Sequence, residues 1–242
     1  MVILARPLGA GEPRTLVVPG LGATAGEARI PASGVAGTRT VLTLPSHADA
    51  PDAEVGCWHY PVLARDVAPF LAGHTRAIGV SLGAAVLCAA LVDDPRALDR
   101  LVLLFPAALS EPRAAGSAEL VLAMADAAEA GDRERLRELV SAGLPAGTGS
   151  YADDRTGALL RLAPALRAVA EQVPVPDPSA LAGVTADVLV VAATGDPLHP
   201  VSAAEEVVAA FPRARLVRFD SAAPLVTHRR EVRDVIVKHL AG

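Results

Sequence analysis

The sequence predicts an α/β protein with a mostly parallel, doubly wound sheet, and three observations carry this prediction. Short apolar runs alternate with longer helical stretches along most of the chain. Most of the runs are continuous rather than alternating in polarity, which is typical of strands buried on both faces of a parallel sheet. A chain of 242 residues with 52% hydrophobic residues is also large enough to bury such a sheet in one core.

Seven apolar runs are expected to be strands, and these are Val2–Ala5, Thr15–Val18, Thr40–Leu44, Ala77–Val80, Leu101–Phe105, Val188–Ala192 and Leu216–Phe219. The first two are joined by the turn Gly9–Glu12, which is short enough to predict an antiparallel hairpin. The helices expected to cover the sheet are Pro61–Ala72, Leu82–Val92, Ala203–Phe211 and Arg230–Leu240. Strands that alternate with helices in this way indicate right-handed crossovers.

Residues 106–186 interrupt this alternation because they contain no convincing strand. Their helical stretches are Ser117–Ala130, Asp132–Ala142 and Asp153–Gln172. Gly- and Pro-rich breaks separate these stretches, as at 143–147. We therefore expect residues 1–105 and 187–242 to form the core, and 106–186 to form a helical cap, or lid, inserted before the last two strands.

Composition excludes several classes of protein. The net charge of −5 leaves no basic surplus to bind nucleic acid. The two cysteines, Cys57 and Cys88, are too few for a disulfide scaffold or a four-ligand zinc site, and they fit a reducing, cytoplasmic setting. The apolar start of the chain is broken at Arg6, and the longest apolar run, 77–92, is shorter than the roughly 20 residues of a membrane-spanning helix. We expect neither a signal peptide nor a membrane partner.

The motif Gly79-Val80-Ser81-Leu82-Gly83 follows one expected strand directly and opens the next expected helix. A serine in this strand–turn–helix context is the arrangement of a nucleophile elbow, where a tight turn lifts the hydroxyl above the sheet. Residue frequencies predict about 0.07 such motifs by chance in this chain. The alternative interpretation is a glycine-rich turn with an idle serine.

A serine nucleophile needs N–H donors for the oxyanion and an acid that orients its base. The N–H groups of Leu82, at the start of a helix, and of Leu21, in the loop Pro19–Gly22, are the candidate donors. Asp196 follows an expected parallel strand, where sites in such sheets collect, and is the candidate acid. A dinucleotide phosphate loop at 20–26 is the rival interpretation, although its last glycine is one place late and no acidic residue ends the next strand.

Together these segments make the chain resemble the α/β-hydrolase fold over nearly its whole length. The residues that carry the resemblance are Gly79–Gly83, Pro19–Gly22, Gly195-Asp196-Pro197, the helical insertion, and the final strand and helix. The resemblance implies a Ser–Asp–His triad in this chain order, a cap that forms much of the substrate pocket, no metal and no organic cofactor.

The expected histidine is where the sequence departs from this pattern. Members of the family commonly carry Gly-His shortly after the last strand, and Ala222 stands at that place here. His228 lies about six residues later and could serve as base if its loop folds back. His199, three residues after Asp196, could reach Ser81 from another direction. The sequence does not decide between His199 and His228. Of the other histidines, His59 is a possible pocket residue, and His47, His74 and His239 are expected at the surface or near the terminus.

The favoured hypothesis is a hydrolase of a small, mostly apolar ester, thioester or lactone. In it Ser81 attacks, Asp196 orients, and His228 or His199 transfers the proton. If no histidine reaches Ser81, the same pocket would suit a cyclase or lyase of specialised biosynthesis, because proximity and electrostatics then supply most of the catalysis. A non-catalytic binding protein and a dinucleotide-dependent reductase are more distant options. The expected partner is a small-molecule substrate, and the oligomeric state stays open.

Overall fold

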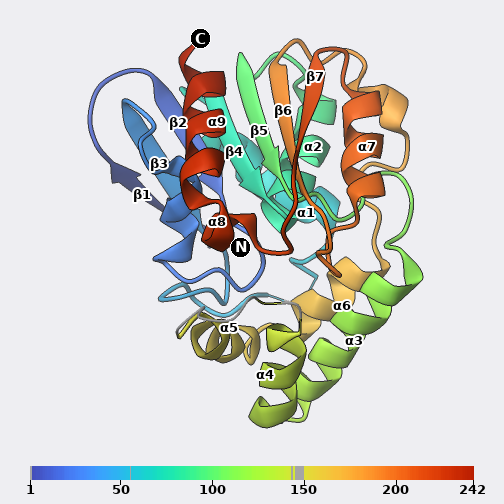
Figure 1. The fold of residues 1–242 in the computed structure, drawn as a ribbon. Helices are drawn as coiled ribbons and strands as arrows, with labels where there is room; N and C mark the ends of the chain where they lie inside the picture. Colours follow the sequence, from blue (N-terminus) through green and yellow to red (C-terminus); the bar gives the residue numbers. More distant parts are fainter. Residues whose placement is uncertain (1, 55, 143, 145–149) are drawn as a thin grey trace.

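The computed structural model describes residues 2–54, 56–142, 144 and 150–242. Its centre is one seven-stranded sheet with the order β1-β3-β2-β4-β5-β6-β7 (Figure 1). The strands are β1 (Leu4–Leu8), β2 (Arg14–Val18), β3 (Thr38–Thr43), β4 (Arg76–Val80), β5 (Arg100–Leu104), β6 (Asp187–Ala193) and β7 (Ala214–Phe219). Strands β2 to β7 pair in parallel, which confirms the predicted α/β class with a mostly parallel sheet.

The hairpin predicted between the first two strands is wrong. β1 pairs antiparallel with β3, from Leu4 opposite Thr43 to Leu8 opposite Arg39, so β3 lies between β1 and β2. The reason is burial. Four of the five residues of β1 are exposed, and Pro7 lacks an N–H, so β1 suits the edge of the sheet. β2 is buried along four residues and needs a hydrogen-bonded neighbour on both sides.

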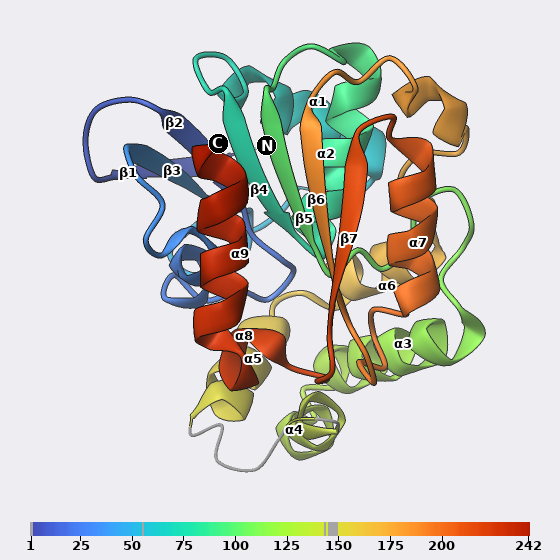
Figure 2. The same ribbon diagram turned by 45° about the horizontal axis from the view of Figure 1, so that its top comes forward.

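Helices cover both faces of the sheet. On one face lie α1 (Tyr60–Val67), the short η2 (Ala68–Phe70), α2 (Leu82–Asp93) and α7 (Val201–Ala210), and on the other lie η1 (Glu27–Ala32) and α9 (Arg229–Ala241) (Figure 2). Successive strand residues face opposite layers. In β5, Leu101 and Leu103 join the core cluster of α1 and α2, whereas Val102 and Leu104 join that of α9. None of the described helices is long and apolar enough to cross a membrane.

Four further helices lie together beyond one end of the sheet, and these are α3 (Ala115–Glu129), α4 (Arg133–Ser141), α5 (Tyr151–Leu159) and α6 (Ala163–Glu171) (Figures 1 and 2). The single helix predicted at 153–172 is two helices. Pro164 has no N–H to continue α5, so the chain turns at Leu160–Leu162 and restarts with the proline in the first turn of α6. Of the break predicted at 143–147, residue 144 alone is described.

The last part of the predicted insertion lies elsewhere. The short helix η3 (Pro178–Leu181) and the following turn lie near Pro95, where Thr185 N–H bonds to Pro95 O at 3.2 Å. Pro95 belongs to the connection that precedes β5, at the amino end of the sheet. The chain must return to this end because β6 runs parallel to β5. Of the described helices within residues 106–186, α3–α6 therefore lie at the end where the strands finish, and η3 lies at the other.

Candidate active site

Ser81 stands alone between the end of β4 and the first residue of α2, as the motif predicts. Its backbone has φ 50° and ψ −110°, a left-handed conformation that a non-glycine residue adopts at a cost of order 1–3 kcal/mol. Its N–H donates to Leu104 O at 2.8 Å, which fixes the turn to the neighbouring strand β5. The turn presents the serine side chain beyond the carboxyl end of the sheet, where it lines a cavity.

The two glycines of the motif are required by close backbone approach. A Cβ at Gly83 would lie 2.1 Å from Val18 O, because α2 begins directly against the end of β2. A Cβ at Gly79 would lie 2.7 Å from Gly83 O. Any side chain at either position would push α2 away from the sheet and move Ser81 with it.

The structure brings Ser81, His199 and Asp196 into one hydrogen-bonded chain. Ser81 Oγ lies 2.8 Å from His199 Nε2, and His199 Nδ1 lies 2.7 Å from Asp196 Oδ2. The carboxylate can only accept, so it selects the tautomer with the proton on Nδ1 and leaves Nε2 free to accept from the serine hydroxyl. The side chains of His199 and Asp196 are only 13% and 14% exposed, so little solvent competes for these bonds.

Asp196 is held in its ionised form. Burial opposes its ionisation most strongly, but the hydrogen bonds from His199 and from the Leu198 N–H, which lies 2.8 Å from Oδ1, outweigh it and keep the pKa of Asp196 below its ordinary value. A buried carboxylate of this kind orients an imidazole and stabilises the imidazolium that forms when it takes a proton.

Asp196 and His199 come from a single loop between β6 and α7. Two side chains of the α3 region hold this loop at Leu198 O, which accepts from Arg113 Nη1 at 2.9 Å and from Ser117 Oγ at 3.0 Å. The ring of Phe105 lies against His199 on another side, with 6.3 Å between the ring centroids. His199 is thereby held both from the end of the sheet and from the helices beyond it.

His228, the other candidate base, makes different contacts. It lies between α8 (Pro224–Thr227) and α9, where its Nδ1 pairs with Thr227 Oγ1 at 2.8 Å and its ring packs on Phe219. Ala222, at the place where the fold commonly has its histidine, lines the same cavity as Ser81. The geometry therefore favours His199 over His228.

The loop that contains Leu21 is held by two side chains. Gly22 N–H donates to His47 Nε2 at 2.8 Å, and Leu21 O accepts from Arg155 Nη2 at 2.9 Å. These two backbone atoms belong to one peptide group, so the Leu21–Gly22 peptide is fixed at both of its polar atoms. His47 comes from the loop after β3 and Arg155 from α5.

The expectation that His47 lies at the surface is wrong, because its side chain is only 2% exposed. Its Nδ1 pairs with Pro45 O at 2.8 Å, which places the proton on Nδ1 and leaves Nε2 as the acceptor for Gly22. Burial lowers the pKa of His47 to about 4, against the raising effect of the Pro45 carbonyl, and the charges of Arg155 and Arg161 lower it further.

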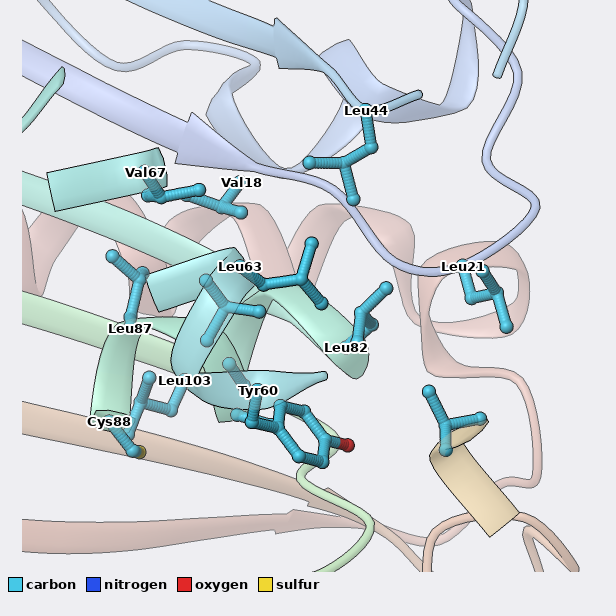
Figure 3. Packing of buried hydrophobic residues seen from close by; sticks show 14 of the residues in the cluster. Val18, Leu21, Leu44, Tyr60, Leu63, Val67, Leu82, Leu87, Cys88 and Leu103 are labelled. Atoms are coloured by element: carbon cyan, nitrogen blue, oxygen red, sulfur yellow. The ribbon is translucent and has the colours of Figure 1, made fainter. Parts of the chain in front are cut away.

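The predicted oxyanion donors fit this arrangement. Leu82 is the first residue of α2, so its N–H has no intrahelical acceptor. Within the described part of the chain, neither this N–H nor that of Leu21 donates to another group. Both residues line the cavity beside Ser81, and Figure 3 shows their side chains on the same side of the core as the Tyr60 hydroxyl.

The remaining histidines lie away from Ser81. His239 is buried rather than at a free surface, with Nε2 at 3.1 Å from Leu101 O and from Asp187 O. His74 pairs with Thr40 Oγ1 at 2.8 Å. His59 is exposed at the start of α1 and is not part of the cavity wall.

The cavity beside Ser81 has a volume of about 250 Å³. Its wall is largely apolar, and α3–α6 contribute Leu120, Met124, Leu139, Leu159, Leu166 and Val169. Two polar residues of the wall, Tyr60 and Arg113, were not expected from the sequence, because neither belongs to a motif. Among the described residues, no group of three or more His, Cys, Asp or Glu side chains could hold a metal ion.

A scan against known protein families finds no match to this sequence, and neither does a search of curated proteins. Solved structures do match. A hydrolase from Pseudomonas aeruginosa PA01 is 19% identical, with a TM-score of 0.80 over 99% of this chain and 94% of that one. An esterase from Exiguobacterium antarcticum is 16% identical, with a TM-score of 0.79 over 99% and 96%. The 2-hydroxy-6-oxo-6-phenylhexa-2,4-dienoate hydrolase of Rhodococcus sp. strain RHA1 is 18% identical, with a TM-score of 0.76 over 100% and 99%.

These likenesses cover nearly the whole chain. They agree with the mostly parallel seven-stranded sheet and its flanking helices. A deep-sea metagenomic enzyme that is 11% identical, MGS-M2 from the Medee basin, is described as an α/β hydrolase and matches 99% of this chain with a TM-score of 0.79. The chain therefore has the α/β-hydrolase fold.

Proposed function

We propose that the protein is a serine hydrolase that cleaves a small, mostly apolar ester, thioester or lactone. The observation that carries this proposal is the continuous chain from Ser81 Oγ to His199 and Asp196, with contacts of 2.8 and 2.7 Å. A base within hydrogen-bond reach of the nucleophile, oriented in turn by an acid, is the arrangement that acyl transfer requires. The esterase and hydrolases of the same fold support this class of reaction.

In the proposed reaction His199 Nε2 takes the hydroxyl proton of Ser81 as Oγ attacks the substrate carbonyl carbon. The carbonyl oxygen becomes an oxyanion, which accepts hydrogen bonds from Leu21 N–H and Leu82 N–H. The leaving oxygen or sulfur takes the proton from His199 as its bond to carbon breaks. A water molecule, deprotonated by His199, then releases the acid and restores Ser81.

Residues 106–186 act in this proposal as the cap, chiefly through α3–α6. Their apolar side chains form much of the cavity wall, which supports a substrate with an apolar body. The volume of about 250 Å³ supports a small substrate rather than a polymer.

The proposal is tested by intact mass after incubation with a fluorophosphonate probe. We expect wild type to gain one probe adduct rapidly, Ser81→Ala to gain none, and His199→Ala to react at least about 10³-fold more slowly. His228→Ala is the matched control, since it removes an imidazole that bonds to Thr227 instead, and it should react like wild type.

Loss of labelling in His228→Ala with normal labelling in His199→Ala would assign the base to His228. A well-folded wild type that is not labelled would overturn the serine-hydrolase proposal. It would instead favour non-hydrolytic chemistry in this cavity, of the cyclase or lyase kind.

A further inference from the structure

Arg113 is a half-buried cation in the wall of the cavity, and it forms no ion pair with any described residue. Its hydrogen bonds go to uncharged acceptors. Nε donates to Val169 O at 3.0 Å, and Nη1 donates to Ser117 Oγ and Leu198 O. Its second terminal nitrogen, Nη2, makes no hydrogen bond to the described part of the chain. A guanidinium in such surroundings lacks the counter-charge that buried cations normally have.

The two carboxylates of the cavity wall are already engaged. Asp196 interacts with the Arg113 charge, but its Oδ1 and Oδ2 accept from Leu198 and His199. Glu27, the other carboxylate of the cavity wall, accepts from Thr24 N–H at 2.7 Å. Arg155, the second guanidinium of the wall, is bonded to Leu21 O. Arg113 differs from Arg155 in its place, because its charge acts on the Tyr60 hydroxyl, and its Nη2 is a free donor beside the apolar space.

Tyr60 supplies a second unused donor in the same wall. Its ring is buried with 4% of the residue exposed, and its hydroxyl forms no hydrogen bond within the described residues, yet it lines the cavity. Figure 3 shows the hydroxyl on the side of the ring away from Leu87 and Cys88. Burial raises the pKa of Tyr60 to about 12, with Arg113 acting in the opposite direction, so the hydroxyl stays protonated and can donate.

We propose that Arg113 and Tyr60 form a subsite that binds a carboxylate carried by the substrate at a distance from its scissile carbonyl. A carboxylate accepts from a guanidinium and a phenol together and would supply the missing counter-charge. This inference rests on the proposed hydrolase function and narrows its substrate to an ester, thioester or lactone with an apolar body and one anionic end.

The binding test uses hexanoate and its neutral analogue hexanamide as probes, with dissociation constants from calorimetry. We expect wild type to bind hexanoate more tightly than hexanamide. The preference should fall about 10-fold or more in Arg113→Met and several-fold in Tyr60→Phe, since a hydrogen bond to a charged group is lost in each. Tyr60→Phe is isosteric, so it keeps the test decisive if Arg113→Met fails to fold. Tyr151→Phe removes a hydroxyl from another part of the wall and should keep the wild-type preference.

The activity test compares mono-p-nitrophenyl glutarate with p-nitrophenyl hexanoate, an uncharged ester of similar length. We expect kcat/KM to favour the glutarate ester in wild type, and this ratio should fall in both variants. The ratio is decisive because loosening of the Leu198 contact would slow both esters alike.

Equal binding of hexanoate and hexanamide, or a preference unchanged in Tyr60→Phe and Arg113→Met, would overturn the subsite. Labelling of Ser81 together with such a result would leave the hydrolase proposal standing. Selective hexanoate binding that depends on both residues, without turnover of either ester, would support the subsite and count against the hydrolase.

Discussion

His47 Nε2 accepts the backbone N–H of Gly22 at 2.8 Å, and this bond connects the loop after β3 to the loop that carries a proposed oxyanion donor. Replacing His47 by Phe removes the acceptor, so that Arg155 alone holds the Leu21–Gly22 peptide, and this loosens the adjoining Leu21 N–H. We expect kcat for p-nitrophenyl hexanoate to fall about 10-fold or more with little change in KM, because the donor acts mainly in the transition state. Steady-state kinetics measure the change.

The matched control for this variant is His74→Phe, which removes a histidine bonded to Thr40 in the turn before β4. It should leave kcat within about 2-fold of wild type. His47→Gln should recover part of the loss, because its amide oxygen can accept from Gly22. Equal losses of kcat in His47→Phe and His74→Phe would contradict a specific role for the Gly22 bond.

The low pKa of His47 also predicts a pH dependence of stability. Its pKa is about 4 in the folded protein, against an ordinary value of 6.5 that applies to the unfolded chain. Between these two pH values the folded state therefore binds fewer protons than the unfolded state. The unfolding free energy should therefore be highest above pH 6.5 and fall as pH decreases towards 4, by roughly 3 kcal/mol from this group.

Urea unfolding of wild type and His47→Gln between pH 4 and 7.5 isolates this contribution. The pKa of His239 is also lowered, chiefly by burial. His239 therefore adds a pH dependence of the same sign to the unfolding free energy, and this contribution is the same in wild type and in His47→Gln. Parallel stability curves for the two proteins would show that His47 is not the titrating group.

Asp196→Asn tests the orientation of the proposed base. The amide would donate to His199 Nδ1, which moves the imidazole proton to Nε2 and removes the acceptor for Ser81. We expect kcat to fall about 10⁴-fold while the fold is retained. Asp220→Asn is the control, since Asp220 accepts from Thr194 Oγ1 at 2.8 Å at the end of the neighbouring strand and makes no contact with His199. A comparable loss in Asp220→Asn would point to a general effect of charge on this edge of the sheet.

Gly83→Ala tests the packing of the serine turn. The added methyl would meet Val18 O at 2.1 Å, a backbone contact that cannot be relieved by a side-chain rotation. We expect the unfolding free energy to fall by more than about 3 kcal/mol. Gly116→Ala, in α3, meets nothing within 4 Å and should be neutral or stabilising by up to about 1 kcal/mol. Chemical denaturation distinguishes the two, and similar values would refute the close-approach argument.

The parts of the fold that sequence predicts best are those with a strong local signal. Apolar runs, most of them continuous, overlapped all seven strands, the first run only at Leu4 and Ala5, and the Gly–Ser–Gly spacing indicated the turn at Ser81. Strand pairing could not be predicted in the same way. The residues that connect β1 to β2 would permit a hairpin, although the two strands do not pair. The true partner of β1, which is β3, is set by which strands require two neighbours, and that is a property of the whole sheet.

The candidate site shows the same limit. Asp196 could be located because acids at the end of a parallel strand gather near the nucleophile. Whether His199 or His228 contacts Ser81 depends on the paths of the loops after β6 and β7. Hydrophobic periodicity does not predict the path of a loop. His47 lies in a loop outside any recognisable motif. The residues next to it in the sequence therefore do not predict that it is buried or that it bonds to Gly22. Tyr60 and Arg113 have ordinary apolar or amphipathic neighbours, and their shared cavity is created by packing of α1, α3 and α6.

Asp196 and His199, the proposed acid and base, lie only three residues apart in the sequence, so one loop positions both side chains. Its internal geometry is set within residues 196–199 and is anchored at Leu198 O, so it does not depend on aligning two separate connections. In the proposed mechanism the connection after β7 carries no reacting group, and its residues Ala222 to Val226 line the cavity. Substitutions in the loop after β7 would therefore alter the shape of the cavity without moving Asp196 or His199, and the loop after β6 is a short continuous segment that could be transplanted whole onto another sheet of this kind.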